Sequence, residues 1–569
     1  MQLVVSEKPS VGSSIAKVLG AHTRKDGYIE GSGYIISWCI GHLVAPAPPE
    51  EYDDRYRRWD ILDLPIVPDV WQYQVLKGTA KQFNLLKRLM NRRDVTEIIC
   101  ATDAGREGEH IFRLVYNEAG CKKPFKRLWI SSLEEQSIRD GFNSLHDGHE
   151  FDNLYYAALA RSKADWLIGI NATRLYSLKN DQTLNIGRVQ TPVLNMLVRR
   201  EQDIRNFVPK LYYTVELDLG AFTATTDKIV EKMNAESIMR SCNNRTAVVT
   251  DIVTETKSTA PPKLYDLTTL QREANKSYGY TAQFTLDTAQ KLYEKKLITY
   301  PRTDSRYITS DVHDTIPGLL NIISSKLSLP IDFIPDTERI TDNSKVSDHH
   351  ALLPTKALES TDLSKLTANE RDVLFLILRQ LLCSAAEPYK YDTIKVTLEC
   401  EGIAFHASGK TVIDMGWRKY LSGETDDTNE TMTLPLLNKG AVFENAISRI
   451  KEYKTSPPKH YTEDTLLSAM ENAVKTDNSV RQGLGTPATR AGIIENLVTR
   501  GFVERKGKSL IPSDKGDKLI SLVPDTLKSA DMTAQWEAEL SDIANGRKQE
   551  REFVQEIQEY INDLVNKER

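Results

Sequence analysis

Tyr300, Pro301 and Arg302 stand in a row, directly after the amphipathic segment 289–296. A tyrosine hydroxyl can attack phosphorus and form a covalent ester, and a neighbouring guanidinium can bind the phosphate oxygens in a bidentate manner. This pair therefore has the chemistry needed to cut a phosphodiester. The chain contains 23 tyrosines, however, and most tyrosines are half-buried aromatic residues with a polar tip. The residue types alone are thus more typical of a structural role for Tyr300.

A second group of reactive residues consists of the carboxylates Glu7, Asp103 and Glu107. Residues 3–5 and 97–102 are apolar and are each predicted to form a buried strand that leads into a turn and a helix. Acidic side chains at the carboxyl ends of strands in one sheet can converge on a hard cation such as Mg2+. The alternative is that each acid only stabilises the start of a helix through the helix dipole.

The elements that must position these groups fall into several regions. Strand, turn and helix occur twice and predict a doubly wound α/β domain over about residues 1–150. Residues 151–207 have a helical apolar face, whereas 211–219 and 393–400 alternate like half-buried strands. We therefore expect a β-rich domain made from two distant stretches, with a helical domain inserted between them. A Ser-Pro-Pro-Lys hinge at 456–459 precedes a helical C-terminal region of winged-helix character.

Composition sets the class of protein. A chain of 569 residues is too long for one core, and we expect about three to five domains. No apolar run is long enough to span a bilayer, and the first residues do not resemble a signal peptide. The six cysteines are scattered without a C-x-x-C pair, which predicts reduced thiols, a cytoplasmic protein and no zinc ribbon.

Charge is unevenly distributed. The net charge of −5 does not indicate a nucleic-acid-binding protein, but residues 161–200 hold seven basic residues against two acidic ones. A local basic channel in an acidic protein would bind one DNA strand without coating the whole surface. A solvated helical face explains the same charges equally well.

Seven motifs follow one another along the chain: Ser6-Glu7-Lys8-Pro9-Ser10, Thr102-Asp103-Ala104-Gly105-Arg106-Glu107-Gly108-Glu109, 160–165, 187–192, 297–305, 348–355 and 483–490. The first two resemble those of a Toprim domain, and the fifth surrounds Tyr300. In this order the seven motifs resemble those of the type IA DNA topoisomerases, and most closely the bacterial topoisomerase III branch. The ordered set is far more specific than any single motif and covers the chain from residue 1 to about residue 550.

The resemblance implies a mixed α/β toroid with a Toprim domain, helical domains and a β-rich domain. The implied domains are I at 1–150, IV at 151–207 and 461–569, II at 208–265 and 388–460, and III at 266–387. It also implies an ATP-independent enzyme that cuts one DNA strand, forms a 5′-phosphotyrosine at Tyr300, passes a strand and religates. We expect relaxation of negative supercoils, with decatenation left open.

The resemblance also assigns residues. Glu7, Asp103 and Glu107 would bind Mg2+, Lys8 would assist the leaving 3′-oxygen, and Arg302 and His349 would act on the phosphate or in a proton network. Weaker candidates beside the Toprim motifs are Arg127 and Trp129. The expected DNA contacts, or residues that order the DNA groove, are Arg161, Asp165, Arg188, Gln190 and Thr489. The implied partners are single-stranded and negatively supercoiled DNA, with a RecQ-type helicase and a single-strand-binding protein as candidates, and we expect a monomer without membrane contact.

One position departs from the family pattern. Gly105 stands where an aspartate is usual, which predicts a weaker or single metal site, with Glu109 directed elsewhere. Ser408-Gly409-Lys410-Thr411 resembles the end of a Walker A loop but lacks the first glycine, so we expect no ATP site. Two other classes remain open, a Toprim metal-dependent nuclease or primase-like enzyme and a non-catalytic single-stranded DNA-binding protein.

Overall fold

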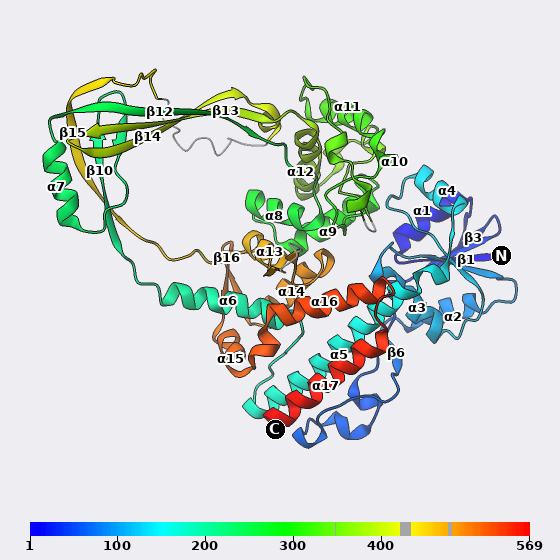
Figure 1. The fold of residues 1–569 in the computed structure, drawn as a ribbon. Helices are drawn as coiled ribbons and strands as arrows, with labels where there is room; N and C mark the ends of the chain where they lie inside the picture. Colours follow the sequence, from blue (N-terminus) through cyan, green and yellow to red (C-terminus); the bar gives the residue numbers. More distant parts are fainter. Residues whose placement is uncertain (347–348, 422–433, 476–480) are drawn as a thin grey trace.

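The computed structural model describes residues 1–346, 349–421, 434–475 and 481–569. Figure 1 shows the helices and strands arranged as a ring around a wide opening. The N-terminal sheet and the long helices α5 and α17 form one side, and a β-barrel lies at the far side. Asp348 and the acidic segment 424–430 lie outside the described residues.

The N-terminal unit is built on a seven-stranded sheet of order β2-β3-β4-β1-β7-β8-β9. Strands β4, β1, β7 and β8 run parallel to one another, as the doubly wound prediction requires, and the antiparallel pairs β3–β4 and β8–β9 extend the sheet on its two sides. The strands are β1 (Gln2–Ser6), β2 (Thr23–Lys25), β3 (Tyr28–Gly31), β4 (Tyr34–Trp38), β7 (Glu97–Ala101), β8 (Phe125–Arg127) and β9 (His146–Asp147). A separate pair is formed by β5 (Val44–Pro46) and β6 (Tyr73–Val75).

Helices cover both faces of this sheet. Val4 and Ile99 belong to one buried cluster, together with side chains of α1 (Pro9–Leu19) and α4 (Glu135–Asn143). Leu3, Val5 and Ile98 belong to another, together with α2 (Ala80–Met90) and α3 (Arg106–Glu118). Because successive strand residues face opposite sides, an unbroken apolar strand is buried on both faces. The two predicted strands, and the helix predicted after each of them, are confirmed.

The second unit joins chain segments that are far apart in sequence. Helices α5 (Asp152–Asn180) and α17 (Glu550–Glu568) run side by side in Figure 1, and α16 (Ala530–Ala544) also packs on α5. Their side chains share one buried cluster with α6 (Gln190–Arg205). The remaining elements here are α13 (Glu463–Glu471), α14 (Pro487–Thr499), α15 (Asp514–Leu522), β16 (Tyr461–Thr462), β17 (Val474–Lys475), β18 (Arg481–Gln482), β19 (Val503–Lys506) and β20 (Ser509–Pro512). The three-stranded sheet β16-β20-β19 beside these helices fits the expected winged-helix character.

A closed barrel of order β10-β11-β14-β13-β12-β15 forms the far side of the ring. Buried and partly exposed residues alternate along β10 (Leu211–Asp218), as the sequence pattern predicts. The other barrel strands are β11 (Thr223–Thr225), β12 (Arg245–Thr259), β13 (Tyr389–Cys400), β14 (Ile403–Asp414) and β15 (Val442–Lys454), with α7 (Lys232–Cys242) packed against them. The Walker-like segment 408–411 lies inside β14 and is no loop before a helix.

Helices inserted between β12 and β13 bring the chain back toward the N-terminal sheet. They are α8 (Leu267–Tyr278), α9 (Ala282–Glu294), α10 (Ser310–His313), α11 (Ile316–Leu327) and α12 (Ala368–Ala385). The segment that follows α9 reaches the N-terminal unit, where the backbone N–H of Tyr300 donates to the carbonyl of Ser131 at 3.1 Å. Within the described ranges, the helices include none with the length and apolarity to cross a bilayer.

Candidate active site

A cavity of about 960 Å³ lies where the N-terminal sheet, the helical insert and the C-terminal helices meet. Nine of the residues singled out from the sequence line it: Glu7, Asp103, Glu107, Arg161, Asp165, Tyr300, Arg302, His349 and Thr489. Lys8, Arg188 and Gln190 do not belong to its lining. The fold thus brings most of the candidate residues to one place, although they come from distant segments.

Tyr300 is 6% exposed and lies beside carboxylates at the ends of two strands. Burial raises the pKa of its hydroxyl, Asp103 and Glu7 raise it further, and the positive charge of Arg302 opposes them. The tyrosine is therefore protonated at neutral pH in this environment. A phenol held neutral next to a guanidinium is set to lose its proton only as it reacts.

His349 packs against Tyr300, with 4.6 Å between the ring centroids. Its Nε2 hydrogen bonds to the carbonyl of Ala104, and its Nδ1 lies 2.9 Å from the hydroxyl of Ser131. Burial lowers the pKa of His349 to about 4, so the ring is neutral. A carbonyl can only accept, so Nε2 carries the proton and Nδ1 accepts from Ser131. Both nitrogens are therefore engaged, which suits a network role better than a direct phosphate contact.

Glu7 and Asp103 form the carboxylate pair of the cavity. Glu7 is 3% exposed, and one of its oxygens accepts a hydrogen bond of 3.3 Å from the backbone N–H of Asp103. Burial and the charge of Asp103 raise the pKa of Glu7 to about 8. Asp103 Oδ2 is buried without a hydrogen-bond partner among the described residues. Two crowded, desolvated carboxylates with an unused oxygen fit a hard divalent cation.

Glu107 is held apart from this pair. Its Oε1 lies 2.5 Å from Nε2 of His42, and half of its side chain is exposed. Hydrogen bonding and charge from His42 lower the pKa of Glu107 to about 2, against the effect of burial. In the described part of the chain, no three His, Cys, Asp or Glu residues are arranged to hold a metal together. In this arrangement the carboxylates of Glu7 and Asp103 are available to a metal ion, and that of Glu107 becomes available only if it leaves His42.

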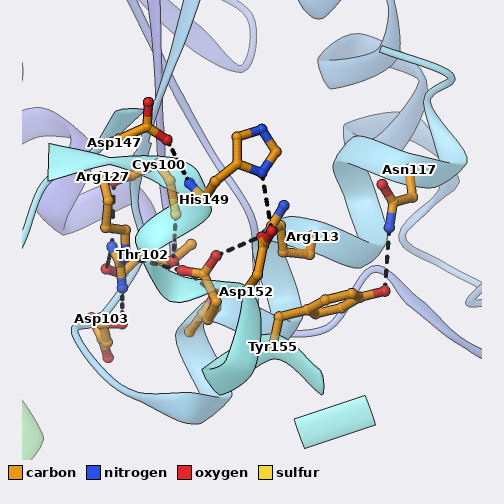
Figure 2. Close-up of polar contacts among 12 residues, drawn as sticks. Cys100, Thr102, Asp103, Arg113, Asn117, Arg127, Asp147, His149, Asp152 and Tyr155 are labelled. Carbon is orange, nitrogen blue, oxygen red and sulfur yellow. Dashed lines mark hydrogen bonds and ion pairs between the residues drawn. The ribbon is translucent and has the colours of Figure 1, made fainter. Parts of the chain in front are cut away.

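Arg127, which is fully buried, holds the turn that carries Asp103 from the protein interior. Its guanidinium donates to the carbonyls of Thr102 at 2.7 Å, Asp103 at 2.8 Å and Leu128 at 3.0 Å. The hydrogen bonds to Thr102 and Asp103 are drawn in Figure 2. Arg127 Nε also lies 3.1 Å from Glu109, a carboxylate with no exposed surface. Glu109 is thus directed into the protein, as expected, and does not replace the carboxylate missing at Gly105.

Gly105 joins this turn to α3 with a φ of +153°, and a Cβ there would meet nothing within 4 Å. The backbone angle, and not lack of space, favours glycine at this position. Arg113, about two turns further along α3, pairs with Glu109 at 3.0 Å and with Asp152 at the start of α5. Figure 2 shows Arg113 pointing toward Asp152 and His149. These contacts tie the sheet unit to α5.

Lys8 lies at the start of α1, where its Nζ is 3.8 Å from Glu294 at the end of α9. This distance is too long for a hydrogen bond. The side chain is one-quarter exposed and loosely paired, and its charge lowers the pKa of neighbouring Glu7.

On the other wall of the cavity, Arg161 Nε lies 3.7 Å from Asp165 on the same helix. Arg188 lies behind the wall with no exposed side-chain surface, and its Nε donates to Asp165 at 3.0 Å. Its other end pairs with Glu537 of α16 at 2.8 Å. Glu537 could not be singled out from the sequence, because a single glutamate in an amphipathic helix looks like any solvated charge.

Gln190 and Thr489 each stand at the start of a helix. Gln190 Nε2 donates to the carbonyl of Asn185 at 3.1 Å, which braces the turn before α6. The hydroxyl of Thr489 donates to the carbonyl of Thr486 at 3.1 Å and accepts from its backbone N–H at 3.0 Å. This capping box places the N-terminus of α14, a favourable position for a phosphate, at the cavity.

A ring fold with a doubly wound sheet and a tyrosine beside carboxylates at the strand ends is typical of a type IA DNA topoisomerase. Comparison with known proteins agrees: a DNA topoisomerase family model matches residues 149–555, and a Toprim domain model matches residues 2–133. The chain belongs to the type IA DNA topoisomerase family and is an isomerase that acts on DNA. Toprim domains in general bind a divalent metal.

Among individual proteins, the chain is 40% identical to DNA topoisomerase 3 of Bacillus licheniformis over 592 residues. The alignment covers 99% of this chain and 81% of that relative. It is also 41% identical to DNA topoisomerase 3 of Bacillus subtilis, with the same coverage. The solved structure of full-length topoisomerase I from Thermotoga maritima matches with a TM-score of 0.76 and 23% identity, over 99% of this chain and 90% of that one. This last likeness concerns the fold alone.

Proposed function

We propose that this topoisomerase cuts one DNA strand through a covalent 5′-phosphotyrosine at Tyr300. The observation that supports this most strongly is that Tyr300 is buried between Arg302 and the carboxylates Glu7 and Asp103 in one cavity. A structural tyrosine would gain nothing from two neighbouring carboxylates that raise its pKa. A nucleophile needs a phosphate-binding cation on one side and a metal-binding pair on the other.

In this reaction the oxygen of Tyr300 bonds to phosphorus, and the bond from phosphorus to the 3′-oxygen breaks. The tyrosine hydroxyl gives up its proton and the leaving 3′-oxygen takes one up, so the step is balanced without a co-reactant. Religation is the reverse, and the phosphotyrosine conserves the energy of the cleaved bond. No ATP is required.

Arg302 binds the phosphate oxygens and stabilises the charge that develops on them. His349 acts through its hydrogen bonds to Ser131 and Ala104, which hold its ring against Tyr300. Lys8 supplies a proton to the 3′-oxygen, and its loose pairing with Glu294 leaves it free to turn toward the DNA.

Glu7, Asp103 and Glu107 would hold Mg2+, which when bound organises the DNA phosphates and assists religation. Mg2+ is usually held by one or two protein carboxylates together with substrate phosphates. The buried pair Glu7 and Asp103 meets that need, and Glu107 completes the set when it leaves His42. Because Gly105 contributes no carboxylate, we infer one metal ion per chain.

Single-stranded DNA lies along the wall formed by α5, α14 and α16. Arg161 and the helix N-terminus at Thr489 contact phosphates, because both line the cavity. Arg188 and Gln190 do not line the cavity but position residues around it. Arg188 donates a hydrogen bond to Asp165, and Gln190 donates one to the turn before α6.

We assign the chain the four domains expected from its sequence. Tyr300 then lies in the helical insert, and the metal-binding carboxylates Glu7 and Asp103 lie in the Toprim domain. Strand passage requires the insert to separate from the Toprim domain while the barrel spans the gap. We infer a cytoplasmic monomer that works with a RecQ-type helicase and a single-strand-binding protein. The six cysteines, all buried and unpaired, are consistent with a reducing compartment.

Relaxation of plasmid DNA tests this proposal. Wild-type protein with Mg2+ is expected to relax negatively supercoiled circles and to leave positively supercoiled circles unchanged, because only the former open into single strands. Tyr300→Phe is expected to be inactive, whereas Tyr307→Phe serves as a control, since Tyr307 lies between Lys263 and Lys345 outside the cavity. Equal activity on both circles would refute the single-strand mechanism, and nicking by Tyr300→Phe would indicate a Toprim nuclease.

A further inference from the structure

Glu537 is an acidic side chain on the wall of a groove that has to bind an anion. It projects from α16 into the cavity lining, and its side chain is 14% exposed. Guanidinium groups from three separate segments surround it, namely Arg106 at the start of α3, Arg161 on α5 and Arg188 before α6. A backbone phosphate would seek the same surroundings.

We propose that Glu537 acts as an internal phosphate mimic, which competes with the DNA backbone for the groove arginines and thereby lowers the affinity for single-stranded DNA. This inference rests on the proposed DNA groove and adds a residue that limits binding. A strand-passing enzyme must release the DNA that it holds. A built-in competitor makes release easier and keeps the arginines oriented.

The distances show which arginines remain open to a competing anion. Glu537 is closest to Arg188, at 2.8 Å, whereas Arg106 Nη2 is 3.8 Å away. Arg161 is 3.7 Å from its own partner Asp165. Distances of this length are ion pairs without hydrogen bonds. A phosphate oxygen at normal hydrogen-bond distance would satisfy Arg106 and Arg161 better than the carboxylates do.

Arg188 supplies an independent observation. It is fully buried and forms ion pairs with Asp165 and Glu537, yet its Nη1 and Nη2, like Oε1 of Glu537, lack a well-formed hydrogen bond among the described residues. A buried guanidinium with an unused N–H indicates an incomplete anion site. Arg188 therefore attracts Glu537 by charge from the buried side, while Arg106 and Arg161 line the cavity and stay available to an anion.

The charges set the direction of the effect. The cluster of Arg106, Arg161, Arg188, Asp165 and Glu537 carries three positive and two negative charges, an excess of one. Burial opposes ionisation of Glu537, but Arg188, Arg161 and Arg106 hold its pKa at about 2. The carboxylate is thus charged at any working pH. Replacing it with the isosteric amide raises the net charge of this five-residue cluster from one positive charge to two.

The test compares Glu537→Gln with Glu539→Gln. Glu539 lies on the same helix, and its side chain is 16% exposed and pairs with Lys548 at 2.8 Å. It does not line the cavity, so it is a control matched in charge and burial. Binding of an end-labelled single-stranded oligonucleotide is followed by fluorescence anisotropy in EDTA over a series of NaCl concentrations. Glu537→Gln is expected to bind about fivefold tighter than wild type at low salt, with a salt slope steeper by about 0.7. Glu539→Gln is expected to match wild type.

Each outcome is informative. Equal affinity of Glu537→Gln and Glu539→Gln, or weaker binding by Glu537→Gln, would overturn the mimic. Failure of the wild-type protein itself to bind the oligonucleotide would instead overturn the proposed groove. If Glu537→Gln does not fold, Glu537→Asp replaces it, because the shorter side chain withdraws the carboxylate while keeping its charge. That variant is expected to bind tighter than wild type by a smaller factor, and unchanged or weaker binding would again reject the proposal.

Discussion

Replacement of Arg127 by methionine should loosen the turn that carries Asp103, although Arg127 itself does not line the cavity. Methionine keeps much of the length of the arginine side chain but donates no hydrogen bonds. The substitution removes the hydrogen bonds to the carbonyls of Thr102, Asp103 and Leu128, and the ion pair with buried Glu109.

The magnitude follows from the contacts that remain. Breaking a buried ion pair by removing one partner costs about 3–5 kcal/mol, because it leaves an uncompensated charge. Glu109 keeps its second partner, Arg113, at 3.0 Å, so the lower end applies, about 3 kcal/mol. At about 1.4 kcal/mol per factor of ten, this free energy raises the frequency of local opening roughly a hundredfold.

Native-state hydrogen exchange measures this opening locally, which suits a multidomain chain that has no single free energy of unfolding. In Arg127→Met, the amides of β7 and α3 should lose about two orders of magnitude of protection, while those of the barrel stay unchanged. Lys126→Met is the matched control on the same strand, since its half-exposed side chain pairs with Glu97 at a distant 3.6 Å. Equal protection of 97–118 in the two variants would refute the anchoring role of Arg127.

Three further outcomes are expected. The pKa of His349 is about 4 against an ordinary 6.5, so as pH falls below 6.5 the unfolded chain takes up a proton before the folded chain does. The neutral, buried ring of His349 therefore contributes fully to the free energy of unfolding above pH 6.5, and this contribution is lost as pH falls toward 4. His349→Gln should remove up to about 3 kcal/mol of the pH dependence of that free energy, as measured by hydrogen exchange at a series of pH values. A pH profile equal to that of wild type would contradict a buried neutral ring. Calorimetric titration with Mg2+ should give one site per chain, lost in Glu7→Gln and only weakened in Glu107→Gln; two tight sites would contradict the inference drawn from Gly105. Arg188→Lys should weaken binding of single-stranded DNA about tenfold, because one ammonium cannot bridge two carboxylates as the guanidinium fork does; affinity equal to wild type would remove its role in ordering the groove.

Local patterns in the sequence were sufficient to predict individual strands and helices of the N-terminal sheet. The apolar runs at 3–5 and 97–101, each followed by a turn and a helix, predicted the doubly wound sheet because strand burial and helix starts are local properties. The closure of the barrel could not be predicted, since β10 pairs with β15 across more than two hundred residues. Alternation identifies a strand but not its partner.

The same limit applies to the site. Tyr300, Glu7 and Asp103 were recognisable from motifs, and they line one cavity. The partners that control them, such as Ser131 at His349 and His42 at Glu107, have no sequence signal of their own. Their contribution comes from contacts between distant segments, which only the folded chain provides.

The proposed reaction depends on a covalent bond between Tyr300 and DNA. The most direct measurement is to incubate the protein with end-labelled single-stranded DNA and Mg2+, quench with denaturant and look for a protein–DNA adduct. Wild type and Tyr307→Phe should give an adduct on the 5′ side of the break, and Tyr300→Phe should give none. An adduct that persists in Tyr300→Phe, or cleavage without any adduct, would show that Tyr300 is not the nucleophile.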